Sequence, residues 1–246
     1  LVFDNATHAY TLAGARLELG ASGEIDVVSG SHEVAAPLEL AGNANVVRSP
    51  GATLTLSGAL AFGGTLRNSG TGTTRMTGSG SDGAVLLTDG TLVFSGADYR
   101  FRSTASNGRE ALEMRPATQS PMTLEIRDGS KLALTGLLVG SASGAAGNCH
   151  LVVADASVDA DGEVTVGNRS SGSVRVDLVD GAFFTSRGGN MNFGVNGTAA
   201  MNVSNATFIA RQLTHGGYAL NLPGSNPRGG TSTIDVWDGG LLEVTE

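Results

Sequence analysis

The chain has 246 residues, of which 37 are glycine, 15 % are charged and 5 % are aromatic. Its formal net charge of −8 supplies no basic face to neutralise phosphates, which argues against nucleic acid or anionic lipid as the main partner. Helices favour runs of Leu, Glu, Lys and Arg at a 3.6-residue period, whereas this composition suits short strands joined by tight turns.

Membrane insertion and disulfide bonding are both disfavoured by the sequence. No apolar run approaches the length of a membrane span, so we expect no transmembrane segment. Cys149 is the only cysteine and is expected to be a small, half-buried residue. The chain opens with Leu1, and we expect either that a signal peptide has been removed or that this is a piece of a longer protein.

The first eighty residues contain short alternating segments between glycine-rich turns, as at 17–23 and 46–51. They resemble a phrase that returns more regularly further along the chain, but they are shifted against it by one residue. A shift of one residue moves every side chain of a strand to the opposite face. We therefore expect the N-terminal part to place its turns differently.

The recurring phrase has two apolar residues around a middle residue, followed by a turn residue, Asp or Asn. Its copies lie at 85–91, 124–130, 151–157, 176–182, 201–207 and 234–240. The turn residues are Asp89, Asp128, Asp155, Asp180, Asn205 and Asp238, at successive spacings of 39, 27, 25, 25 and 33 residues. A repeat of this size is typical of solenoids, and the longer spacings indicate coils with an inserted loop.

The apolar positions predict two ladders of stacked side chains. Four residues before the turn residues stand Val85, Leu124, Leu151, Val176, Met201 and Ile234, and two before them stand Leu87, Ile126, Val153, Leu178, Val203 and Val236. Residues two apart in a strand share a face, and the residue between them, usually polar, should face solvent. A second phrase ends in Gly140, Gly167 and Gly194, each 27 residues apart, so each coil should contain at least two strands.

These patterns predict an all-β fold, a single-stranded parallel β-helix (β-solenoid) of roughly ten coils of about 25 residues. Residues 1–246 should form one continuous solenoid. A meander or sandwich would also contain short strands and glycine-rich turns, but it would not require the same apolar positions to recur at a long period.

Residues 97–121 break the pattern and are expected to form a loop excursion from the rod. Its candidate binding residues are Tyr99, Arg100, Phe101, Arg102, Arg109 and Arg115. Aromatic rings and guanidinium groups can stack on sugars or hold acidic groups. The alternative is that the segment caps or shields one side of the rod.

The acidic residues are expected to act mainly in turns. A carboxylate before a small residue can accept a hydrogen bond from the turn's own backbone, and this interpretation competes with a catalytic pair of acids. Asp155, Asp159 and Asp161, followed by Glu163, form the densest cluster and are a weak candidate for Ca²⁺. No histidine pair has metal-ligand spacing, so we expect no cofactor.

Residues 1–96 resemble the autotransporter-associated β-strand repeat proteins of bacteria. The similarity is carried by the segments 1–6, 10–14, 32–40, 51–58 and 90–96. Residues 124–210 look like a related repeat of type V secretion passengers. The resemblance implies a secreted, surface-attached, right-handed β-helix, and the family has no shared catalytic motif to carry over.

The sequence therefore favours a non-enzymatic β-helical segment of a secreted or bacterial cell-surface protein, acting as a stalk, adhesin or fibre subunit. The alternative is a polysaccharide-binding or polysaccharide-degrading β-helix, such as a glycan lyase or hydrolase. The expected partners are surface glycans or a second copy stacked head to tail, because open solenoid ends expose unpaired strand edges.

Overall fold

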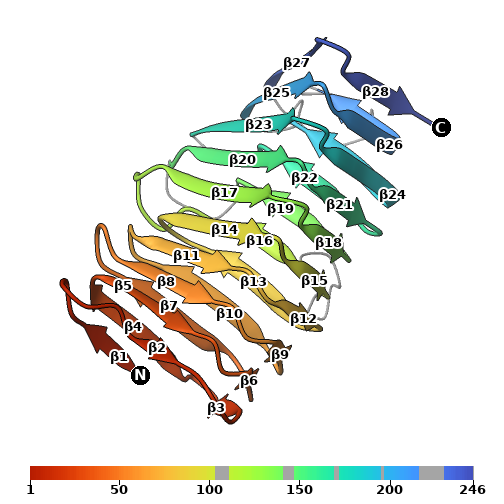
Figure 1. Ribbon diagram of the computed structural model, residues 1–246. Helices are drawn as coiled ribbons and strands as arrows, with labels where there is room; N and C mark the ends of the chain where they lie inside the picture. Colours follow the sequence, from red (N-terminus) through yellow and green to blue (C-terminus); the bar gives the residue numbers. More distant parts are fainter. Residues whose placement is uncertain (103–110, 141–146, 169–171, 195–196, 216–229, 246) are drawn as a thin grey trace, which may run out of the picture.

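The computed structural model describes residues 1–102, 111–140, 147–168, 172–194, 197–215 and 230–245. Within these ranges the chain forms 28 strands and the turns between them, with no helix. The strands stack as a staircase of coils that runs from the N-terminal strand β1 to the C-terminal strand β28 (Figure 1).

Each coil has three sides, which we call the first, second and third faces. The first face is a ten-stranded parallel sheet. Its strands are β2 (Thr11–Leu12), β5 (Ser31–Val34), β8 (Thr53–Leu56), β11 (Thr73–Met76), β14 (Thr91–Ser95), β17 (Met122–Arg127), β20 (Cys149–Ala154), β23 (Ser173–Val179), β25 (Thr198–Ser204) and β27 (Thr231–Trp237).

The second and third faces are joined into one 18-stranded sheet by two long strands, β24 (Phe183–Phe193) and β26 (Thr207–His215), which run through both faces. The other strands of the second face are β3 (Leu17–Leu19), β6 (Leu38–Leu40), β9 (Leu60–Phe62), β12 (Ser79–Ser81), β15 (Asp98–Phe101), β18 (Lys131–Leu134), β21 (Ser157–Ala160) and β28 (Leu241–Val244). Those of the third face are β1 (Val2–Asp4), β4 (Glu24–Ser29), β7 (Ala44–Arg48), β10 (Thr65–Ser69), β13 (Ala84–Leu87), β16 (Leu112–Met114), β19 (Leu137–Val139) and β22 (Val164–Val166).

Throughout the described residues the strands pair in parallel, each with the strand one coil further on. This arrangement confirms the predicted all-β parallel solenoid and excludes a core of antiparallel hairpins. The step between aligned residues ranges from 18, between Met76 and Phe94, to 34, between Phe208 and Leu242. Coil length is therefore variable, and the shortest step lies in the N-terminal half.

The predicted apolar ladders are confirmed from β17 onward. Ile126 pairs with Val153, and the ladder continues through Leu178 to Val203. All four side chains are buried. Burial of such aliphatic side chains stabilises the fold by about 1.5–3 kcal/mol each, which makes this column the main source of stability.

The predicted place of the copy at 85–91 in these ladders is wrong. Val85 and Leu87 lie on β13 of the third face and pair with Leu112 and Met114. The residues that pair with Leu124 and Ile126 on the first face are Leu92 and Phe94. Both strands contain apolar residues two positions apart, and β13 is followed by Asp89-Gly90 as β17 is by Asp128-Gly129, so the local sequence does not distinguish them.

The turn residues explain how the chain passes from the first to the second face. Five of them adopt the left-handed backbone conformation, with φ between 46° and 57°: Asp128, Asp155, Asp180, Asn205 and Asp238. Asp and Asn tolerate this region better than other non-glycine residues. At the misassigned copy the positive φ belongs to Gly90, not to Asp89.

The expected excursion at 97–121 is wrong for the two strands that this range contains, β15 and β16. Strands β15 and β16 belong to the second and third faces and pair with strands of the coils on both sides. Residues 103–110 lie outside the described residues.

Candidate functional sites

Tyr99 and Phe101, predicted as surface binding residues, lie in the core instead. They occupy alternate positions of β15, and both side chains are almost fully buried. Their rings stack at 5.2 Å, and Tyr99 also meets Phe94 edge to face at 5.6 Å. Because strand alternation points both rings inward, neither can stack on a ligand from outside. The prediction that they bind a ligand is therefore wrong.

The three predicted arginines that the structure describes have separate environments. Arg100 is exposed on the outer side of β15. Arg102 forms an ion pair with Asp82 at 3.4 Å. Arg115, which follows β16, donates from Nε and Nη2 to the two oxygens of Glu113, each at 2.7 Å. Arg109 lies outside the described residues.

The calcium candidates are also separated by the fold. Asp155 is a left-handed turn residue, whereas Asp159 lies on β21, accepts a hydrogen bond from Thr185 at 2.5 Å and forms an ion pair with Arg187 at 3.2 Å. Asp161 follows β21, and its backbone N–H donates a hydrogen bond to the backbone oxygen of Leu134. Among the described residues no group of three His, Cys, Asp or Glu side chains is arranged to hold a metal ion. The predicted calcium site is therefore not formed by these acids.

One charged cluster stands on the outer side of the first face. Asp177 on β23 accepts hydrogen bonds at its Oδ2 from Nε2 of His150 and from Nε of Arg175, both at 2.7 Å. His150 is paired with Arg175 in the register of β20 and β23. The second oxygen of Asp177, Oδ1, is buried and has no hydrogen-bond partner in the described part of the chain. We call these three residues the first-face cluster.

The charges of the first-face cluster set the protonation of its carboxylate. Asp177 was expected to face solvent but is only 7 % exposed. Burial by itself raises the pKa of Asp177, whereas the hydrogen bonds and charges of Arg175 and His150 lower it, and the net pKa lies below the ordinary value. The carboxylate is therefore ionised at neutral pH and orients the imidazole of His150, as an acid partner does in catalytic dyads.

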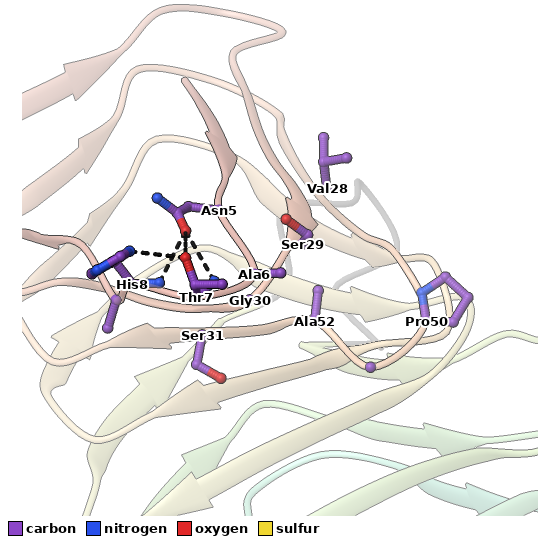
Figure 2. A pocket seen from close by; sticks show the side chains of 12 residues that line it. Asn5, Ala6, Thr7, His8, Val28, Ser29, Gly30, Ser31, Pro50 and Ala52 are labelled. Carbon is purple, nitrogen blue, oxygen red and sulfur yellow. Dashed lines mark hydrogen bonds between the residues drawn. The ribbon is translucent and has the colours of Figure 1, made fainter.

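A pocket of about 560 Å³ lies at the corner between the third and first faces, near the N-terminal end of the solenoid. Three turns of this corner line it, residues 5–9, 28–31 and 50–52 (Figure 2). We call it the corner pocket. Turns of one corner lie one above the other in a solenoid, so residues far apart in the sequence share one hollow.

Asn5 organises the wall of the corner pocket. Its Oδ1 accepts hydrogen bonds from the backbone N–H groups of Thr7 and His8, both at 2.9 Å, and from the Thr7 hydroxyl at 3.0 Å (Figure 2). Its Nδ2 donates to the hydroxyl of Tyr10 at 2.7 Å. Such Asx turns follow from the short polar side chain of asparagine. Sequence reasoning missed this pocket, because only the Asn-x-x-His spacing at the turn hints at it.

A second hollow lies inside the column and is dry. It holds only about 10 Å³ and is lined by aliphatic and aromatic side chains, including Leu151, Phe184 and Met201. A cavity this small and apolar holds no ordered water. It is a packing gap, not a candidate binding site.

The fold places this chain among the parallel β-solenoid proteins. No family model matches the sequence, no curated protein matches it, and no solved structure matches it. In the part of the chain that the structure describes, no helix is long and apolar enough to cross a membrane.

Proposed function

We propose that the protein is a non-enzymatic scaffold of a secreted or bacterial cell-surface protein, acting as a stalk, adhesin or fibre subunit. The observation that carries this proposal is the single apolar column enclosed by three parallel faces. In such a column each coil satisfies its backbone hydrogen bonds through the coils on either side, with strands ~4.8 Å apart. The product is a stiff, extended body that can hold a distant group away from a surface.

The resemblance to autotransporter-associated repeats supports the extracellular setting and the right-handed coil. The scaffold proposal is tested on cells of the source strain with an antibody against the folded chain. Labelling of intact cells or of the culture medium is expected, and labelling only after lysis would overturn the extracellular setting. Turnover of a polysaccharide panel by the purified chain would overturn the non-enzymatic part.

The partners we propose are surface glycans and a second copy of the chain. The edge formed by β27 and β28 exposes Val236, Trp237, Leu241 and Val244, which suits the addition of another coil. Electron microscopy of the purified protein tests the second partner: filaments with a repeat close to the length of one rod are expected, and isolated rods at high concentration would contradict it.

A polysaccharide-degrading activity is the second candidate, and the first-face cluster is the observation that favours it. A histidine oriented by Asp177, beside the exposed guanidinium of Arg175, has the parts of a general base and an anion-binding group. The test is glycan turnover by the wild type and by His150→Gln. Wild-type turnover that is lost in His150→Gln would support this candidate. It would be rejected if the wild type turned over no glycan, or if His150→Gln were as active as the wild type.

A further inference from the structure

The corner pocket is formed by close approach of consecutive coils. Gly30 has a φ of +83°, and a Cβ added there would lie 2.0 Å from the backbone oxygen of Asn5. Only glycine therefore lets the 5–9 turn rest directly against the 28–31 turn. Gly51, with a φ of +75°, makes the equivalent bend in the third turn. The hollow is thus fixed by backbone packing and does not depend on side-chain rearrangement.

The hydrogen-bond network fixes the tautomer of His8. The Thr7 hydroxyl donates its proton to Asn5 Oδ1, so its contact of 2.8 Å with Nδ1 of His8 requires that Nδ1 be the donor. In the neutral ring Nε2 is then left as an acceptor. His8, one of the residues that line the pocket, therefore keeps one imidazole nitrogen that can accept a hydrogen bond from a hydroxyl.

The rest of the lining is uncharged and mixed in polarity. Hydroxyl groups come from Thr7, Ser29 and Ser31, and apolar surface comes from Val28 and Pro50 (Figure 2). None of the twelve lining residues carries a carboxylate, ammonium or guanidinium group. Next to the pocket, Ser29 donates to the carboxylate of Asp4 at 2.8 Å, which places a negative charge where an anionic ligand would be repelled.

We propose that the corner pocket binds a neutral saccharide unit of a glycan. A sugar presents several hydroxyls that both donate and accept, together with C–H faces that pack on small apolar side chains, which matches this lining. The volume lies within the range of small-molecule sites. The inference deepens the adhesive function proposed above by naming a site and a ligand class, and purified protein can bind or fail to bind whether or not the chain is displayed on cells.

Backbone amide NMR of the ¹⁵N-labelled chain gives the direct test. The neutral probes are cello-, malto-, xylo-, manno- and chito-oligosaccharides, and the anionic probe is an oligogalacturonate. At least one neutral probe is expected to shift amide signals in 5–9, 28–31 and 50–52 in a saturable way, with no such shifts from the oligogalacturonate. Shifts from none of the neutral probes, or stronger binding of the anionic probe at these residues, would overturn the proposal.

Two variants separate the pocket from general effects on the fold. Thr7→Val keeps the side-chain shape but removes the hydroxyl that holds His8, and affinity should fall about tenfold. Its matched control is Thr11→Val, an exposed threonine on β2 outside the pocket, which should bind as the wild type does. Ser31→Trp leaves the Asn5 network in place and should block binding, whereas Ser81→Trp on β12 should not. Unchanged affinity in Ser31→Trp would refute the site even if Thr7→Val fails to fold.

Discussion

Arg48 and Asn68 meet inside the solenoid, where a guanidinium Nη1 donates to the amide Oδ1 at 2.8 Å. The same nitrogen donates to the hydroxyl of Thr74 at 2.6 Å. Asn68 stands in an inward row between Val46 and Leu87, and Thr74 stands between Leu54 and Leu92. Polar residues on three neighbouring strands, β7, β10 and β11, thus interrupt the apolar column at one level.

This polar cluster is imperfectly satisfied. Arg48 is 1 % exposed, and burial lowers its pKa to about 10, while the charge of Asp89 acts in the opposite direction. Arg48 Nε and Asn68 Nδ2 have no hydrogen-bond partner in the described residues. Buried charges that keep only part of their partners cost free energy relative to an apolar core. We therefore expect the cluster to lower the stability of these coils relative to an apolar core.

We first predict opposite effects for breaking and for replacing this cluster. Asn68→Ala should lower the free energy of unfolding by about 3 kcal/mol, because the guanidinium stays buried with fewer partners. The triple variant Arg48→Met, Asn68→Leu, Thr74→Val should recover at least the wild-type stability. Urea unfolding followed by circular dichroism measures both. A triple variant less stable than Asn68→Ala would contradict this account of the buried charge.

Removing the hydroxyl of Tyr99 should stabilise the protein. Its Oη is buried without a hydrogen-bond partner in the described residues, and burial raises its pKa above the ordinary value. Tyr99→Phe should therefore raise the free energy of unfolding by about 1 kcal/mol. Tyr10→Phe is the control, since the Tyr10 hydroxyl accepts a hydrogen bond from Asn5, and its loss should be neutral or slightly destabilising. A hydrogen-exchange or denaturant measurement in which both changes act alike would count against a buried, unpartnered phenol.

Acid should weaken the first-face cluster through Asp177. Its pKa is lower in the folded chain than in the unfolded one, so its contribution is complete above the unfolded value near ~3.9 and disappears as pH falls through the folded pKa. Asp177→Asn should cost roughly 1–3 kcal/mol at pH 7 and flatten the decline of stability below pH 4. The matched control is Asp235→Asn, an exposed position of the same outward row, which should leave the curve unchanged. If the free energy of unfolding depended on pH in the same way in Asp177→Asn and in the wild type, the proposed contribution of the Asp177 carboxylate would be ruled out.

The left-handed turns predict a sharp dependence on residue type. Asp180→Val should lower the free energy of unfolding by about 1–2 kcal/mol, because a β-branched side chain is strained at its φ of 53°. Asp180→Gly should be close to neutral at the same position. The matched change in an extended strand, Asp235→Val, should have an effect within about 0.5 kcal/mol. Thermal unfolding of the three variants measures these differences in stability. If Asp180→Val were as stable as the wild type, the left-handed conformation at this turn would not be required.

The sequence alone supported the fold because its strongest signal is local and periodic. Alternation about Glu125 or Asn202 fixes which side chains point inward, and Asp180 or Asn205 marks the turn that follows. Each of these signals lies within a few residues, where strand geometry and turn preference act directly. The parallel solenoid follows once like residues recur at a long spacing.

The binding residues could not be predicted in the same way. Tyr99 and Phe101 lie in a stretch rich in arginine, which on composition alone indicates a surface loop. Their burial is decided by β15 pairing with β12 and β18, strands far away in the sequence. Gly80 shows the same dependence, because a Cβ there would lie 2.8 Å from the ring of Tyr99 in the next coil.

From its own residues the sequence determined the kind of strand, the inward and outward sides and the left-handed turns. The tertiary structure alone decided which of three faces each strand joins, as the copy at 85–91 demonstrates, and which turns stack to form the corner pocket. The physical reason is that all three faces use the same two-residue alternation, so local propensity is equal for each. Only packing against the coils on either side distinguishes them, and coil length varies too much for a fixed period to substitute for that packing.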